Sequence, residues 1–164
     1  MNEAHLHLLV NHFPIMGSFF SLIILGAGFI TKNATVRKTA YALLVFSALM
    51  TLPAFFSGEG AEEVVEAIPG VSHDTIHEHE ETAELALWIS QLAGIAAALA
   101  LYFEITLHRL ARVTSIVTLV LNIALFGSMT RTGNTGGKIR HPEVEEGYAS
   151  PAKTEGEEHS ESEH

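Results

Sequence analysis

The sequence predicts an all-α integral membrane protein, a bundle of four transmembrane helices with both termini on the outer side. Two observations lead to this prediction. Four long stretches contain no Asp, Glu, Lys or Arg, and the charges between them are sorted by sign. A mean hydropathy of +0.27 beside a formal net charge of -10 fits such a chain, because the charges are confined to a few segments.

Each charge-free stretch has about the length of roughly 20 residues that a helix needs to cross a bilayer. The stretches are Ala4 to Thr31, Thr39 to Gly58, Leu85 to Phe103 and Val113 to Thr130. A soluble four-helix bundle would carry charges on its solvent side every three or four residues, and these stretches carry none. Within one domain, residues 1–147, we predict spans at about residues 8–31, 39–57, 84–104 and 112–130.

The links between the spans predict the orientation of the bundle. The first and third links hold five basic residues against a single Glu, whereas the link from Glu59 to Glu84 holds nine acids and no Lys or Arg. Basic links stay in the cytoplasm, so we expect the acidic link and both termini on the outer side. The first stretch follows no basic segment and is too long for the core of a signal peptide, so we expect it to be retained as a span.

Proline and glycine mark where the helices are expected to bend or end. Pro14 frees the carbonyl of Val10 and predicts a kink beside His12. After the second span, apolar residues from Ala61 to Ile68 fall on one face of a predicted short surface helix, which Pro69 and Gly70 end. Ser72 is expected to cap the third helix, which starts near His73.

Two features are expected after the fourth span. Three glycines, Gly133, Gly136 and Gly137, predict a turn that sends the chain back across the outer face. The segment 148–164 is polar, acidic and low in complexity, so we predict a disordered tail there.

The chain has ten histidines and no cysteine. The absence of cysteine excludes disulfides, thiolate zinc sites, iron-sulfur clusters and the covalent attachment of haem. Nine histidines fall on the predicted outer side, and His12 lies inside an apolar stretch, where an imidazole is costly unless it has a partner or a function. Any metal or haem would therefore be held by His, Met or carboxylate.

Counting residues up from the inner ends of the first and third spans compares the depths of these side chains. His7 and His79 lie 24 residues above Thr31 and Phe103, and His12 and Glu84 lie 19 residues above them. Two imidazoles at one level on different helices can ligate a b-type haem from both sides. We expect His12 and His79 to be the principal pair, because the kink at Pro14 disturbs the count that favours His7.

Three segments, HLLVNHFPIMG, GEGAEEVVEAIPGVSHDTIHEHEETAELA and TGGKIRHPEV, resemble a family of bacterial membrane proteins catalogued as a domain of unknown function, two-two-three-one. The resemblance extends over residues 7–143, and the long acidic link departs from the usual pattern. It implies a bacterial inner membrane location, periplasmic termini and redox work, since relatives are often joined to or encoded beside c-type cytochromes. The positions that it marks are His7, His12, His79 and His141, with Asn11, Pro14, Glu80, Gly136, Gly137, Arg140 and Glu143 around them.

We therefore expect an electron-transfer protein with haem b, rather than a stand-alone enzyme, that acts beside a respiratory complex, a c-type cytochrome or a quinone. Its cofactor would be held by His7, His12, His79 and His141, with Arg140 on a haem propionate. The residues expected to hydrogen-bond to these ligands are Asn11, Glu80, Glu84 and Glu143. Two alternatives stay open: the same histidines could bind copper or zinc, or the chain could be a structural subunit without cofactor. No nucleic-acid partner is expected.

Overall fold

The computed structural model describes residues 2–67 and 71–141, except for the side chain of Arg140, and these residues form helices and no strand. The helices are α1 (Glu3–Val10), α2 (His12–Ile30), α3 (Ala34–Glu66), α4 (His73–Ile105) and α5 (Ala111–Arg140). Because α1 and α2 continue one another, the chain has four helical units long and apolar enough to cross a membrane. The four predicted spans are thereby confirmed in number. Glu143 and the predicted tail at 148–164 lie outside the described residues.

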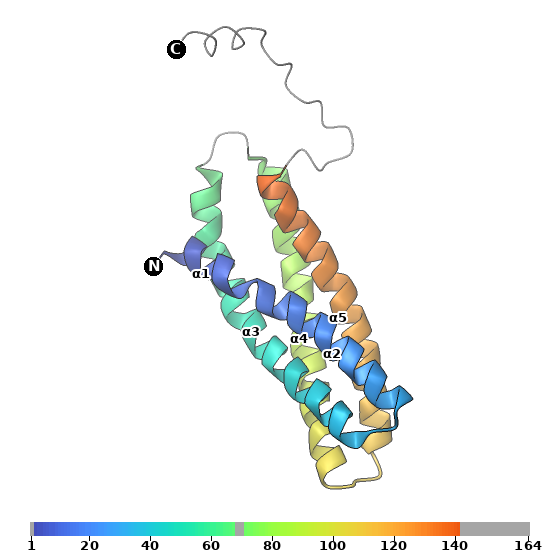
Figure 1. The fold of residues 1–164 in the computed structure, drawn as a ribbon. Helices are drawn as coiled ribbons and strands as arrows, with labels where there is room; N and C mark the ends of the chain where they lie inside the picture. Colours follow the sequence, from blue (N-terminus) through green and yellow to red (C-terminus); the bar gives the residue numbers. More distant parts are fainter. Residues whose placement is uncertain (1, 68–70, 142–164) are drawn as a thin grey trace, which may run out of the picture.

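The helices form one elongated bundle (Figure 1). The start of α1 and the end of α5 lie at one end, and the short links from α2 to α3 and from α4 to α5 lie at the other. The acidic residues at the C-terminal end of α3 and the start of α4 therefore share an end with α1, and the basic links lie opposite. We call these the acidic end and the basic end, and we take the charge-free stretches as the membrane-spanning segments.

The first helical unit bends where the proline predicted a kink. α1 ends at Val10, Asn11 lies between the two helices, and α2 begins at His12. Pro14 has no amide hydrogen to donate to the carbonyl of Val10, so the regular helical bonding is interrupted at this point. The bend lays α1 against α3 at the acidic end of the bundle.

Two expectations about the acidic end were wrong. The predicted separate surface helix is the last part of α3, which continues through Gly58 and Gly60 to Glu66. The predicted turn at the later glycines is also helical, because α5 continues to Arg140. Glycine costs a helix about 1 kcal/mol against alanine, but here the glycines accept side chains of other helices. His7 lies beside Gly58, Glu3 beside Gly60, and His79 beside Gly136.

Small side chains fill the interior of the bundle. The fully buried residues include Ala93, Ala97 and Ala100 on α4 and Ala40 on α3. A Cβ on Gly94 would lie 2.5 Å from the Cβ of Ala48, so α3 and α4 meet at the distance that glycine allows. A few large side chains, among them Tyr41 and Leu125, are also buried, but many others, mostly Leu, Ile and Phe, are exposed on the outside, as expected for a surface in contact with lipid.

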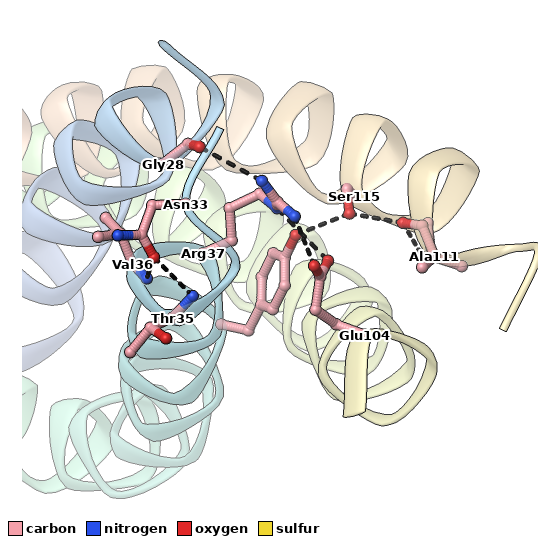
Figure 2. A network of polar contacts seen from close by, with 10 residues as sticks. Gly28, Asn33, Thr35, Val36, Arg37, Glu104, Ala111 and Ser115 are labelled. Carbon is pink, nitrogen blue, oxygen red and sulfur yellow. Dashed lines mark hydrogen bonds and ion pairs between the residues drawn. The ribbon is translucent and has the colours of Figure 1, made fainter. Parts of the chain in front are cut away.

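An ion pair closes the basic end (Figure 2). Arg37 at the start of α3 donates to Glu104 at the end of α4, with Nη2 2.5 Å from Oε1. A second donor, Nη1, lies 3.4 Å from the carbonyl oxygen of Gly28 in α2. Nearby, the Tyr41 hydroxyl donates to Ser115 of α5 at 2.7 Å. These contacts join all four helical units at the basic end.

Candidate functional site

The candidate site lies at the acidic end, where two histidines are held in the same way. The first is His7 on α1, whose Nδ1 is 2.8 Å from the backbone carbonyl oxygen of Ala54 on α3. A carbonyl oxygen only accepts hydrogen bonds, so Nδ1 must carry the hydrogen. In the neutral imidazole the lone pair is then on Nε2. The ring also lies beside Gly58, where a Cβ would be 3.5 Å from Cε1.

The second is His79 on α4, whose ring contacts α5. Its Nδ1 lies 3.1 Å from the backbone carbonyl oxygen of Thr132 and 3.1 Å from Oγ1 of Thr135. The same argument gives Nδ1 the hydrogen and leaves the lone pair of the neutral ring on Nε2. Thr135 is almost fully buried and also bonds to the Thr82 hydroxyl at 3.0 Å. The ring of His79 is thus fixed by α5 on one side.

The two imidazoles are close enough to influence one another electrostatically. His79 lies outside the membrane-spanning segments, six residues before the charge-free stretch of α4 begins at Leu85. Burial lowers the pKa of His79, and the charge that His7 can carry lowers it further, whereas the Thr132 carbonyl and Glu80 act in the opposite direction. His7, unlike His12, therefore acts electrostatically on His79, and burial favours the neutral form of the His79 ring.

Asn11 contributes the one orphaned polar atom of the described side chains. Its Oδ1 is buried and has no hydrogen-bond partner in this part of the chain. Asn11 follows His7 by one helical turn, so the two side chains share a face of the helix. A buried carbonyl oxygen without a donor costs about 1–3 kcal/mol. The site therefore offers an unused acceptor on the same face as His7.

Carboxylates surround the site. Glu62 on α3 faces Glu80 on α4, and the hydrogen bond to Glu80, followed by burial and the charge of Glu80, raises the pKa of Glu62 to about 7. Both residues lie beyond the charge-free stretches. His77 lies 3.6 Å from a Glu80 oxygen and 3.4 Å from a Glu81 oxygen. The expected role of Glu80 in bonding to the site histidine is not seen, because its bonds go to Glu62 and His77.

The other expected site residues are spread around the molecule. His12 is exposed on the outer surface of α2, in a hollow with Phe13 and Phe46 rather than beside His79. His141 ends α5 and is exposed, and Glu84 is exposed on α4. The side chain of Arg140 and all of Glu143 lie outside the described residues. Within residues 2–67 and 71–141, no three His, Asp or Glu side chains converge as they would around a metal ion.

Scans against protein-family models, curated proteins and solved structures found no match to this chain. The family resemblance therefore stays a prediction, and the function is argued from the geometry.

The residues that hold the two rings were not predicted from the sequence. The acceptors are the backbone carbonyls of Ala54 and Thr132, which are invisible in a side-chain pattern. Gly58 and Gly136 did give a signal, because glycine inside a helix often marks a close approach. We interpreted Gly136 as part of a turn and gave Gly58 no role, whereas both make room for imidazole rings.

Proposed function

We propose that this protein binds one b-type haem at the acidic end through His7 and His79 and carries single electrons there. One observation carries the proposal: both imidazoles donate from Nδ1 to a backbone carbonyl, and their Nε2 atoms are left as lone-pair donors. Metal-binding histidines in proteins are commonly oriented by such a bond from the other ring nitrogen. Imidazole pairs on bundle helices are suitable haem ligands.

The donor set fits the group on one further count. Burial lowers the pKa of His79 and so favours the neutral ring, which is the form that binds iron. When bound, the haem would supply the Fe(III)/Fe(II) couple. The protein's part is to hold the two rings, and to set the electrostatic field with the carboxylates of Glu62 and Glu80.

The copper or zinc alternative is less well supported, because within the described residues no three His, Asp or Glu side chains converge as they would around such an ion. If the protein were a subunit without cofactor, the hydrogen bonds that hold His7 and His79 in the same way, each from Nδ1 to a backbone carbonyl, would serve no chemistry. We therefore keep haem as the proposed cofactor.

The test uses controls that the chain itself provides. His5 and His77 each lie two residues from a site histidine on the same helix, and both are exposed. Full-length protein is purified after haem-replete expression, and haem per protein is measured with the reduced-minus-oxidised spectrum. His7→Ala and His79→Ala should each lower haem content at least about tenfold. His5→Ala, His77→Ala and His12→Ala should keep it.

Two results would contradict this assignment. A colourless parent protein would rule out haem, and equal losses in the site and control variants would show that His7 and His79 are not its ligands. In the first case, metal analysis of the same sample separates the copper or zinc function from a structural one. A loss confined to His12→Ala and His79→Ala would restore the pair expected from the sequence.

For the location, we propose the inner membrane of a bacterium, with the acidic end on the periplasmic side and a respiratory-chain partner there. The charge split between the two ends supports this orientation. Ser72 is exposed and makes no side-chain capping bond, and Thr106 lies in a basic link, so single cysteines at these positions should be tolerated. On intact cells, an impermeant thiol reagent should label Ser72→Cys and not Thr106→Cys. The reverse result would invert the orientation.

A further inference from the structure

A shallow hollow of about 350 Å³ lies on the outer surface of the bundle, between α2 and α3. Its lining includes Phe13, Met16 and Phe20 from α2, and Leu43 and Phe46 from α3. Phe13 and Phe46 meet edge to face, with ring centroids 6.2 Å apart. Phe13, Met16, Phe20 and Phe46 are all partly exposed. The hollow therefore opens sideways, toward the lipid that surrounds a membrane-spanning helix.

His12 is the one ionisable side chain in the lining of this hollow. It is exposed, and within the described part of the chain its ring makes no hydrogen bond, ion pair or ring contact. α2 has 19 residues and is about 28 Å long at roughly 1.5 Å per residue, against about 30 Å for the hydrocarbon core. As the first residue of α2, His12 thus lies close to the outer boundary of that core. An unpaired imidazole at this depth calls for a partner.

The composition of the hollow limits what that partner can be. Neutral imidazole has one donor and one acceptor nitrogen, so it can bond to a carbonyl or to a hydroxyl group. The lining contains no Lys or Arg, which disfavours the phosphate of a phospholipid headgroup. The phenylalanine rings favour a flat ring, since aromatic pairs attract beyond their buried area. Leu43 and Phe20 continue the apolar surface below His12, toward the basic end.

We propose that this hollow binds a membrane-dissolved quinone, whose ring contacts Phe13 and Phe46 and whose carbonyl oxygen accepts a hydrogen bond from His12. The isoprenoid tail would follow Met16, Phe20 and Leu43 along the outer surface. A quinol fits the same site, because its hydroxyl can donate to the acceptor nitrogen of the imidazole. The proposal concerns binding only, and it does not depend on haem at His7 and His79.

The experiment uses tryptophan fluorescence, which quinones quench. The chain has one tryptophan, Trp88, which is exposed on α4 and does not line the hollow. The reporter is the full-length variant Trp88→Phe with Phe20→Trp, in phosphatidylcholine nanodiscs titrated with a short-tailed benzoquinone. The reporter should be quenched to saturation. The parent protein should show only the unsaturable quenching that a quinone dissolved in the bilayer causes.

The part played by His12 is tested in the same reporter. His12→Ala should raise the half-saturating quinone concentration about fivefold or more, the effect of losing one hydrogen bond of about 1 kcal/mol. His5→Ala, an exposed histidine outside the hollow, should leave that concentration unchanged. Linear quenching like that of Trp88 would overturn the proposal and leave lipid or water as the neighbour of His12. Saturation that His12→Ala does not weaken would overturn the hydrogen bond that defines the site.

Discussion

The imidazole of His79 lies directly against the backbone of Gly136, where a Cβ would be 2.9 Å from Cε1 and 3.2 Å from Nδ1 of the ring. The next residue, Gly137, has open space at the equivalent position. Of these two consecutive glycines of α5, Gly136 has a histidine ring where a Cβ would lie, and Gly137 does not.

Gly136→Ala is expected to push the His79 ring away from Thr132 and Thr135, which lowers both stability and the occupancy of any ligand at the ring. Gly137→Ala adds a methyl group into open space and should stabilise α5 by up to about 1 kcal/mol, the helix preference of alanine. Thermal unfolding in detergent compares the two variants. Equal behaviour would show that the close approach at Gly136 has no energetic weight.

The Glu62 and Glu80 pair predicts a specific dependence of stability on pH. The pKa of Glu62 is raised from 4.5 to about 7 in the folded protein, so the folded state holds a proton that the unfolded state has lost. This group therefore stabilises the fold fully below pH 4.5. Its contribution is lost as the pH rises through about 7, because two ionised carboxylates then face each other.

Glu62→Gln removes that repulsion and should raise the unfolding temperature at pH 8, with a gain that shrinks toward pH 4.5. Because the pKa of His79 is lowered, His79 makes the fold less stable as the pH falls below 6.5, which is the opposite of the effect of Glu62. This effect is the same in the parent protein and in Glu62→Gln. Glu63→Gln is the matched control, an exposed carboxylate next to Glu62. A gain independent of pH would contradict the shared-proton interpretation.

The ion pair of Arg37 and Glu104 should contribute more to stability than an exposed pair does. Their side chains are 18% and 11% exposed, whereas those of Arg131 and Glu78 are 66% and 44% exposed at a separation of 3.8 Å. Glu104→Gln leaves a poorly solvated guanidinium and should cost about 2–3 kcal/mol. Glu78→Gln should cost less than about 0.5 kcal/mol.

Both variants can be compared by denaturation in mixed micelles, with Arg37→Gln completing a double-mutant cycle. A coupling free energy near zero would show that the pair serves orientation in the membrane rather than stability.

The number of membrane-crossing helices and the place of the bend could be predicted from the sequence, because each depends on the residues of a single segment. Lipid excludes charges from a helix surface, and Pro14 lacks an amide hydrogen wherever it stands. The start of α4 at His73 was predicted from Ser72 as a capping residue. The helix does begin there, although Ser72 makes no side-chain capping bond.

The residue count favoured His7 over His12, but the expected kink at Pro14 led to the choice of His12. Residues five apart on a helix point about 140° away from each other, so only one of the two rings can face the bundle. In the structure His7 faces the carbonyl of Ala54, and His12 lies on the outer surface. The role of Gly58, Gly60 and Gly136 was missed because their partners, Glu3 and the two site histidines, come from other parts of the chain.

The parts of the interior that are rich in alanine, glycine and serine should respond to mutation differently from a core of large side chains. A core of leucine and phenylalanine suffers most when side chains are made smaller, since a cavity remains. Here the Cβ of Ala48 on α3 occupies the space that a Cβ of Gly94 on α4 would need, so there is little volume to remove and none to fill. Each added methylene would have to separate two helices along their length. The distance between helices, rather than the shape of individual side chains, is therefore what the buried sequence encodes.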